Sequence, residues 1–202
     1  MIVFGSSGHA QEISFFLKRN NQKDVSCYIA EELGTVNGAT VIDESQLEKV
    51  LRSAQETVVA AVAIGSGSIR KKVVDKFSAY DNLIFPSFFL GDEFETIGMG
   101  QGNIFFPTFY ATVNVLVGSH NHFNLKTSIS HDVIIGDYNT FSPNVTVAGR
   151  VRIGNNVFLG AGATIVDNVS ICNDVIIGAG AVVIGDIEIS GTYVGVPAKK
   201  IK

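Results

Sequence analysis

A large apolar residue recurs at every sixth position through the second half of this 202-residue chain. The series runs without interruption through Val117, Phe123, Ile129, Ile135, Phe141, Val147, Ile153, Leu159, Ile165, Ile171, Ile177 and Val183. Four positions after each member, the residue is mostly small or β-branched, as at Val133, Val151 and Ala163. An α-helix repeats every 3.6 residues and a strand every two, so neither element explains the pattern.

A six-residue repeat with one large and one small inward residue is typical of a parallel β-helix. Three hexads make one triangular coil, and successive coils stack at the ~4.8 Å spacing of neighbouring strands. Residues 18 positions apart should therefore lie above one another. The phase extends weakly back to Met99, so about 15 hexads up to Glu188 predict roughly five coils. A β-sandwich is the alternative, but its alternating strands would show a period of two.

The first 80 or so residues repeat a different unit, in which an apolar strand, a glycine-rich turn and a helix follow one another. Strands are expected at residues 2–4, 25–29 and 58–64, and helices at 13–19, 44–54 and 69–77. The continuous apolar run at 58–64 is typical of a parallel strand that is covered on both faces. This order predicts a Rossmann-like α/β unit at residues 1–82 and a β-helix domain with a C-terminal tail at 83–202.

Composition excludes several other classes of protein. The chain is 46% hydrophobic and only 17% charged, whereas disordered chains combine low hydrophobicity with high net charge. The net charge is −4 and no long basic tract is present, which argues against nucleic-acid binding. No apolar run approaches the ~18 residues of a membrane-spanning helix. The N-terminus does not resemble a signal peptide, and Cys27 and Cys172 form no CxxC pair, so a cytoplasmic location with reduced thiols is expected.

Several motifs together resemble a known family. The hexad array, the opening GSSGHA, the segment SISHDVIIGDYNTFSP and the ending VGVPAKKI are similar to the left-handed β-helix sugar acyltransferases. Among these the chain resembles bacterial nucleotide-amino-sugar N-acetyltransferases of the bacillosamine-pathway type, with sialic acid O-acetyltransferases as near relatives. The resemblance implies a left-handed coil, although parallel crossovers are otherwise almost always right-handed. It also implies a homotrimer, acetyl-CoA as the donor, and active sites between adjacent subunits.

One histidine is placed to act as a base. Transfer of an acyl group from a thioester needs a group that takes the nucleophile's proton, and neutral imidazole has a suitable pKa. His131 stands at the third position of its hexad, near a predicted coil corner, and Asp132 follows it. The resemblance implies that His131 is the general base and that Asp132 tunes it. A surface histidine in a turn is the alternative.

The 18-residue rule adds candidates on neighbouring coils. Gly149 should lie one coil above His131, where its N–H is a suitable donor to the developing thioester oxyanion. Ala161 and Ala179 are also 18 apart and should form a smooth strip for a pantetheine arm. The resemblance places the coenzyme there, together with Thr140. Small residues at hexad turns are also common for purely structural reasons.

The remaining histidines of the solenoid leave two questions open. Relatives often carry a histidine where this chain has Thr140, and the nearest imidazole here is His122, one coil below. Either His122 substitutes or the coenzyme contact is weaker. A γ-type carbonic anhydrase would use His120, His122 and His131 as zinc ligands, which requires three imidazoles to converge with an open fourth position. The resemblance to the acyltransferases implies no metal.

The N-terminal turn suggests a phosphate site. Residues 5–9 follow a strand and precede a helix, an arrangement that presents backbone N–H groups and a helix N-terminus to an anion. The segment is not GxGxxG, so by itself it does not indicate a dinucleotide. A solvated loop is the alternative for the acidic pair that follows the second strand. The resemblance assigns this unit the nucleotide of a nucleotide-linked sugar, held by Ser7, Gly8, His9, Glu31, Glu32, Ile64 and Gly65.

The sequence thus predicts an acetyl-CoA-dependent N-acetyltransferase for a nucleotide-linked 4-amino-4,6-dideoxy sugar, acting in surface glycan biosynthesis. An O-acetyltransferase for a sugar or sialic acid would use the same base. A γ-type carbonic anhydrase and a non-catalytic structural trimer are the remaining alternatives. The sequence leaves open the nucleotide base, the sugar stereochemistry and the length of the acyl group.

Overall fold

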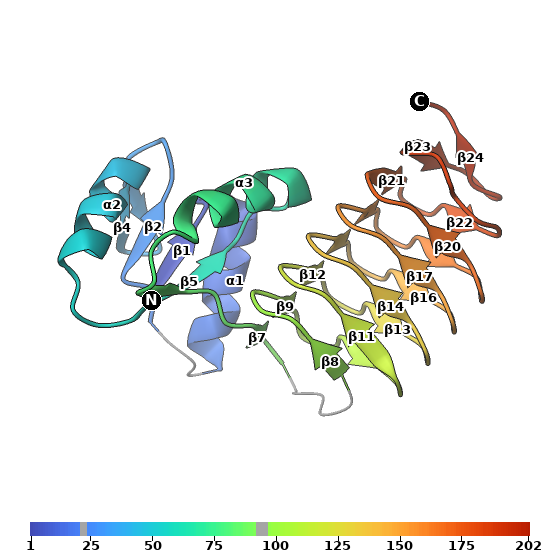
Figure 1. The fold of residues 1–202 in the computed structure, drawn as a ribbon, viewed down its shortest axis with the longest axis horizontal. Helices are drawn as coiled ribbons and strands as arrows, with labels where there is room; N and C mark the ends of the chain where they lie inside the picture. Colours follow the sequence, from blue (N-terminus) through green and yellow to red (C-terminus); the bar gives the residue numbers. More distant parts are fainter. Residues whose placement is uncertain (21–23, 92–96) are drawn as a thin grey trace. The chain divides into compact units, whose positions relative to one another are not determined.

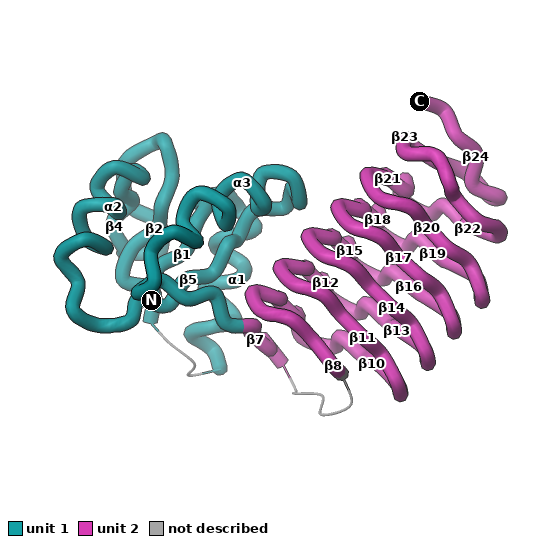
Figure 2. The backbone as a smooth tube through the Cα atoms, viewed as in Figure 1, with its two compact units in different colours: residues 1–86 teal, residues 87–202 magenta. Residues whose placement is uncertain are grey.

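The protein is described by a computed structural model, in which residues 1–20, 24–91 and 97–202 are described. The chain forms two compact units, Met1–Pro86 and Ser87–Lys202, which Figure 2 shows in separate colours. The first unit is an α/β layer structure and the second is a parallel β-solenoid of about six turns (Figure 1). The predicted fold class is confirmed.

The N-terminal unit is built on a six-stranded sheet in the order β3-β4-β2-β1-β5-β6. All neighbours are parallel except β3 and β4. Its strands are β1 (Ile2–Phe4), β2 (Cys27–Ile29), β3 (Gly34–Val36), β4 (Ala39–Ile42), β5 (Val58–Val62) and β6 (Leu83–Ile84), and its helices are α1 (Gly8–Arg19), α2 (Glu44–Ser53) and α3 (Gly67–Phe77).

The hairpin between β3 and β4 was not expected from the sequence. Its two turn residues, Asn37 and Gly38, both have positive φ, at +49° and +82°. An Asn-Gly pair favours this type I′ geometry, which matches the twist of the flanking strands. The short, half-polar strands on either side obscured the signal.

The solenoid consists of three sheets that run along its length. The strands are β7 (Phe88–Phe89), β8 (Ile97–Met99), β9 (Ile104–Phe105), β10 (Tyr110–Ala111), β11 (Val115–Val117), β12 (His122–Phe123), β13 (Ser128–Ile129), β14 (Ile134–Ile135), β15 (Thr140–Phe141), β16 (Thr146–Val147), β17 (Arg152–Ile153), β18 (Phe158–Leu159), β19 (Thr164–Ile165), β20 (Ser170–Ile171), β21 (Val175–Ile177), β22 (Val182–Val183), β23 (Gly191–Val194) and β24 (Lys199–Lys200). Their orders are β10-β13-β16-β19-β22, β20-β17-β14-β11-β8 and β24-β23-β21-β18-β15-β12-β9-β7.

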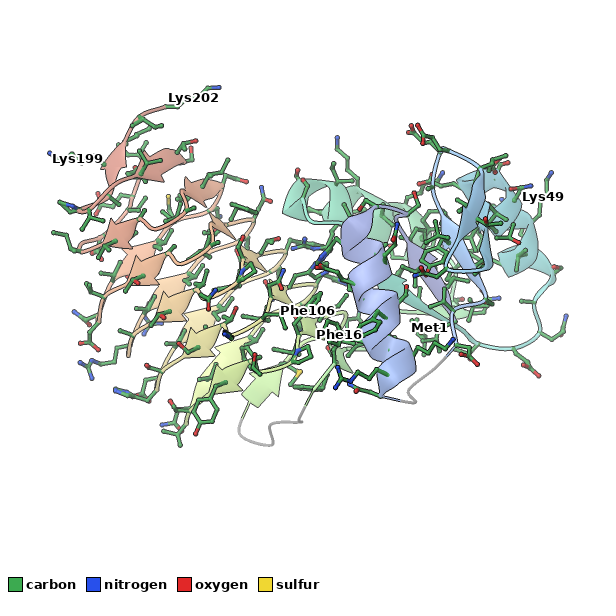
Figure 3. All side chains as sticks on the ribbon, turned by 180° about the vertical axis from the view of Figure 1, so that it is seen from behind. Met1, Phe16, Lys49, Phe106, Lys199 and Lys202 are labelled. Atoms are coloured by element: carbon green, nitrogen blue, oxygen red, sulfur yellow. The ribbon has the colours of Figure 1, made fainter. Side chains whose placement is uncertain are left out.

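Strand pairing follows the predicted 18-residue register. Phe123 pairs with Phe141, Ile135 with Ile153, and so on through the array. The array is about one turn longer than the sequence predicted, because β7 pairs below the first clear hexads and β23 and β24 continue above the last. The final strand is antiparallel, and Figure 3 shows Lys199 and Lys202 extending from this end of the solenoid.

Two interior ladders hold the lower coils together. The rings of Phe89, Phe105, Phe123 and Phe141 stack in sequence with centroids 4.6, 4.9 and 4.5 Å apart. Beside them, Asn103, Asn121 and Asn139 are fully buried at positions where the repeat otherwise has small apolar residues. Each asparagine Oδ1 accepts a hydrogen bond from a backbone N–H on the coil above, at 2.7–2.8 Å. Buried amides are tolerated because these bonds satisfy them.

The corners of the coil have a fixed backbone conformation. Every sixth residue from Gly102 to Gly180 has φ between +54° and +69°. Most of these residues are not glycine; they include Asp132, Tyr138 and Arg150. A left-handed conformation costs an L-residue about 1–2 kcal/mol, so the closed coil imposes it. The corner position expected near His131 is therefore occupied by Asp132.

None of the helices in the described part of the chain combines the length and the apolar character that crossing a membrane requires.

Candidate active site

His131 and Asp132 form a coupled pair at one corner of the solenoid. His131 Nδ1 lies 2.8 Å from Asp132 Oδ2, and Asp132 Oδ1 accepts a hydrogen bond of 2.9 Å from the amide of Asn114, one coil below. These bonds, Asn114 first and His131 second, lower the pKa of the Asp132 carboxyl below its ordinary value. An ionised carboxylate only accepts hydrogen bonds, so Nδ1 carries the proton in the neutral ring. The free lone pair is then on Nε2.

Gly149 lies directly beside the basic nitrogen. A Cβ at this glycine would lie 2.7 Å from His131 Nε2 and 2.6 Å from its Cε1, so only glycine leaves room for the ring. Gly149 is buried, and its N–H finds no acceptor among the described residues. An unused backbone donor in a buried residue is uncommon in proteins. The corner therefore combines a base and an unused N–H donor within a few ångströms.

Two more side chains converge on this corner that were not expected from the sequence. Asp167, one coil above Gly149, has Oδ1 only 3.0 Å from the position of a Cβ on that glycine. Its Oδ2 accepts a hydrogen bond and ion pair from the guanidinium of Arg150. Asp167 is 18 residues after Gly149, as Asn114 is 18 residues before Asp132, so the register alone was sufficient to find both.

The proposed coenzyme strip is present as a stack. Ala161 and Ala179 are both exposed, and the N–H of Gly180 donates a 2.8 Å hydrogen bond to the carbonyl of Ala161. Thr140 lies on β15, half-buried, and is paired in register with His122 below and Phe158 above. His122 is buried, so the surface beside Thr140 carries no exposed imidazole from that position.

The histidines of the solenoid do not gather at one point. His131 is exposed at its corner, whereas His120 is buried and stacked on Tyr138, with ring centroids 5.2 Å apart. Within residues 1–20, 24–91 and 97–202 there is no group of three His, Cys, Asp or Glu side chains arranged as metal ligands.

In the N-terminal unit, three turns meet at one edge of the sheet. They follow β1, β2 and β5, which are neighbours in the order β2-β1-β5 and run parallel. The carboxyl ends of parallel strands form the usual ligand-binding edge of such folds. The three turns contain all the residues that the sequence assigned to the nucleotide, namely Ser7, Gly8, His9, Glu31, Glu32, Ile64 and Gly65.

The first turn leads into a helix with an open N-terminus. Ser7 is the N-cap of α1, yet its side chain makes no capping hydrogen bond, and the first turn holds no acidic residue. Helix α3 also lacks an acid in its first turn, whereas α2 has Glu44 there and a capping box from Asp43. Acids near helix N-termini compete with bound anions for the same donors. Only α1 and α3 therefore start in a way that suits a phosphate. Glu31 and Glu32 are exposed in their turn.

A buried arginine supports this edge from inside. Arg70 of α3 is fully buried, and its Nη1 donates to the carbonyls of Ile64 and Gly65 at 2.7 and 3.0 Å. Burial, and secondarily the charge of Arg70, lower the pKa of His9 from 6.5 to about 4. His9 is therefore neutral near pH 7, and its imidazole can both donate and accept a hydrogen bond.

Comparison with known proteins matches each part of the chain to a described family. Residues 1–77 match the PglD N-terminal domain, and residues 150–185 match the bacterial transferase hexapeptide family, described as six repeats. A search of curated proteins found no match.

Solved structures share the fold over almost the whole chain. The acetyltransferase domain of PglB from Neisseria gonorrhoeae, in complex with acetyl coenzyme A, has a TM-score of 0.90 at 24% identity and covers 99% of this chain and 98% of its own. PerB from Caulobacter crescentus, in complex with CoA and GDP-perosamine, has a TM-score of 0.89 at 25% identity, with 100% and 96% covered. WeeI from Acinetobacter baumannii has a TM-score of 0.85 at 24% identity, with 99% and 98% covered.

The two family matches and the shared architecture agree with the corner geometry, in which a base stands next to an unused backbone donor. On these grounds the chain fits the hexapeptide-repeat sugar acetyltransferase family, whose members are acyltransferases.

Proposed function

We propose that the chain is an acetyl-CoA-dependent N-acetyltransferase that acts on the amino group of a nucleotide-linked 4-amino-4,6-dideoxy sugar in surface glycan biosynthesis. The observation that carries this proposal is the corner at which His131 Nε2 faces the unused N–H of Gly149. Acyl transfer needs a base for the nucleophile and a donor for the oxyanion, and this corner offers both.

The residues divide the chemistry between them. Acetyl-CoA supplies the acetyl group as a thioester. Asp132 holds the Nδ1 proton of His131, so Nε2 accepts the proton of the attacking amine and Asp132 stabilises the imidazolium that forms. The Gly149 N–H donates to the thioester oxygen as negative charge develops there. His131 then holds a proton that it can deliver to the departing thiolate.

Binding of the two substrates is assigned to different parts of the chain. Thr140, Ala161 and Ala179 would contact acetyl-CoA, because they form a strip of small, accessible residues above the corner. The nucleotide would bind at the sheet edge of the N-terminal unit, with its phosphates at the open N-terminus of α1. The ligands in the solved PerB structure, CoA and GDP-perosamine, support this pair of substrate classes.

We also propose that the enzyme is a cytoplasmic homotrimer with active sites between adjacent subunits. Large apolar side chains on the outer faces of the solenoid, including Leu116, Phe158 and Ile176, are exposed in the single chain. Their burial against other copies would stabilise an oligomer. Sedimentation equilibrium gives the mass directly, and a monomer would contradict this part of the proposal.

Release of free CoA thiol in the presence of UDP-, dTDP-, GDP- and CMP-linked 4-amino-4,6-dideoxyhexoses tests the function. One nucleotide should support turnover, and mass spectrometry should find the acetyl group on nitrogen. Isothermal calorimetry with the four free nucleoside diphosphates or monophosphates identifies the base independently. Turnover only with sialic acid or another sugar hydroxyl would instead identify an O-acetyltransferase.

Two cheaper measurements address the remaining classes. A thermal shift with acetyl-CoA should raise the unfolding temperature by mass action, whereas a structural trimer without a coenzyme site would show none. Elemental analysis that found stoichiometric zinc would favour a carbonic anhydrase-like protein over an acetyltransferase.

A further inference from the structure

Two corners of the coil treat the same backbone donor differently. In the closed column, which consists of Ser119, Asp137, Asn155 and Asn173, the residues lie 18 apart and occupy the position before the left-handed corner residue. Each N–H of the first three donates to the side-chain oxygen of the next member, at 2.7 Å in every case. A side chain from the coil above thus closes each donor.

The open column has the same register but leaves its donors free. It consists of His131, Gly149 and Asp167, again 18 residues apart and again just before the corner residue. Gly149 has no side chain to close the N–H of His131. Asp167, by contrast, is the same residue type as Asp137 and stands in the same relation to Gly149 as Asp137 does to Ser119.

Asp167 is close enough to act as a cap but does not. Its Oδ1 lies 3.0 Å from the Cβ position of Gly149, yet no hydrogen bond joins it to the Gly149 N–H. Its other oxygen, Oδ2, is bound by the guanidinium of Arg150. Arg150 is itself fixed at the corner, because its N–H donates 2.9 Å to the carbonyl of His131.

We infer that Arg150 is a positioning residue that holds the Asp167 carboxylate away from the Gly149 N–H and so keeps the oxyanion donor open. The inference rests on the proposed function, because it assumes that this N–H serves acyl transfer. Arg150 also neutralises a carboxylate beside the position where negative charge would develop. Without the guanidinium, Asp167 would be expected to rotate onto the N–H, as Asp137 does in the closed column.

The test is a double-substitution cycle measured as acetyl transfer to the best nucleotide-linked amino sugar of the panel. Arg150→Met should lower kcat about ten- to a hundredfold, because the loss of one oxyanion donor has an effect of this order or greater. Asp167→Ala should stay within about threefold of wild type. The double variant Arg150→Met/Asp167→Ala should recover most of the lost kcat, since the blocking carboxylate is gone.

The matched control is Arg152→Met, which removes the same charge two residues away on the exposed face of β17. It should leave kcat within about twofold, which separates the local effect of Arg150 from general electrostatics. Arg150→Lys, which keeps a cation near Asp167, should retain more activity than Arg150→Met. Far-ultraviolet circular dichroism and the affinity for CoA should be unchanged in all variants.

A spectroscopic measurement does not depend on turnover. In ¹H–¹⁵N NMR spectra, the Gly149 amide proton should move downfield in Arg150→Met, because it gains a carboxylate acceptor, and should return toward its wild-type shift in the double variant. The inference is overturned if the amide does not move, or if Asp167→Ala fails to rescue Arg150→Met. Absence of acetyl transfer in the wild type would contradict the proposed function instead, and the NMR result would still decide the positioning role.

Discussion

The closed and open columns share a backbone but differ in what their N–H groups do. In the closed column, Asp and Asn side chains from the coil above take up each donor, and the corner is sealed. In the open column, glycine replaces the capping residue at 149 and Arg150 diverts the cap at Asp167. The coil supplies identical donors at every corner, so the choice of side chain decides whether a donor supports the fold or is available to a ligand.

Replacing the base should have the largest effect on the open column. His131→Ala should lower kcat about 10²–10⁴-fold, because a positioned general base contributes a factor of this size. Steady-state kinetics with acetyl-CoA and the preferred amino sugar measure it. The neighbouring substitution Ser130→Ala is the control and should have little effect. Activity of His131→Ala within a few-fold of wild type would remove the catalytic meaning of the open column.

A second histidine sharpens the contrast between exposed and enclosed groups. The pKa of His9 is lowered from 6.5 to about 4, so the unfolded chain binds a proton between these pH values that the folded chain does not. The contribution of neutral His9 is complete above pH 6.5 and is lost as pH falls toward 4. Wild type should lose up to about 3 kcal/mol of unfolding free energy over this interval relative to His9→Gln.

Urea denaturation at several pH values measures this difference. Glu12, whose carboxylate lies 3.9 Å from His9 Nδ1, and the buried Arg70 are the charged groups that act on the imidazole and remain in the variant. His131→Gln, which replaces an exposed histidine, is the control and should show no comparable divergence. Parallel stability curves for wild type and His9→Gln would show that His9 is not enclosed.

Alanine at two matched glycines should separate activity from stability. At Gly149 a Cβ would meet the end of the His131 side chain, which can move, so activity should fall about a hundredfold with little loss of stability. At Gly136, beside the closed column, a Cβ would lie 2.8 Å from the backbone oxygen of Gly154, which cannot move freely. Gly136→Ala should therefore lose about 1–3 kcal/mol of stability.

Thermal unfolding and kinetics on the same two proteins measure both quantities. The reverse result, a stable and inactive Gly136→Ala beside an unstable and active Gly149→Ala, would contradict the assignment of the two columns.

The smallest effect is expected for a cap of the closed column. Asn155→Ala removes the acceptor of the Asp137 N–H, at 2.7 Å, in an exposed setting. Loss of one such hydrogen bond should lower stability by about 1 kcal/mol and leave kcat unchanged. Chemical denaturation and the standard assay check both values. A large fall in kcat would mean that this corner, too, serves the reaction.

The sequence predicted the elements whose pattern repeats. The six-residue period predicted the solenoid, and its 18-residue consequence correctly placed Gly149 beside His131. The continuous apolar run of β5 and the glycine turns indicated the parallel sheet of the N-terminal unit. The hairpin of β3 and β4 was missed, because its signal is local and its strands are too short to show a period.

The unpredicted parts of the site depend on side-chain direction. Asn114 and Asp167 were one coil away from candidate residues, but whether an 18-residue neighbour points along the stack or outward depends on its rotamer. The burial of Arg70 beneath Ile64 and Gly65 depends on how α3 packs on its sheet. Sequence charge alone describes that residue as part of a basic run on a helix surface.

The sequence by itself determined which residues are stacked, because a fixed number of residues per coil places every eighteenth Cα in one column. It thereby determined that His131, Gly149 and Asp167 share a corner. The tertiary structure decided what these residues do to one another: the left-handed corner turns Asp132 toward Asn114, and Arg150 draws Asp167 away from an open N–H. Periodicity fixes positions along a repeat, whereas hydrogen bonds depend on side-chain directions that only the closed coil sets.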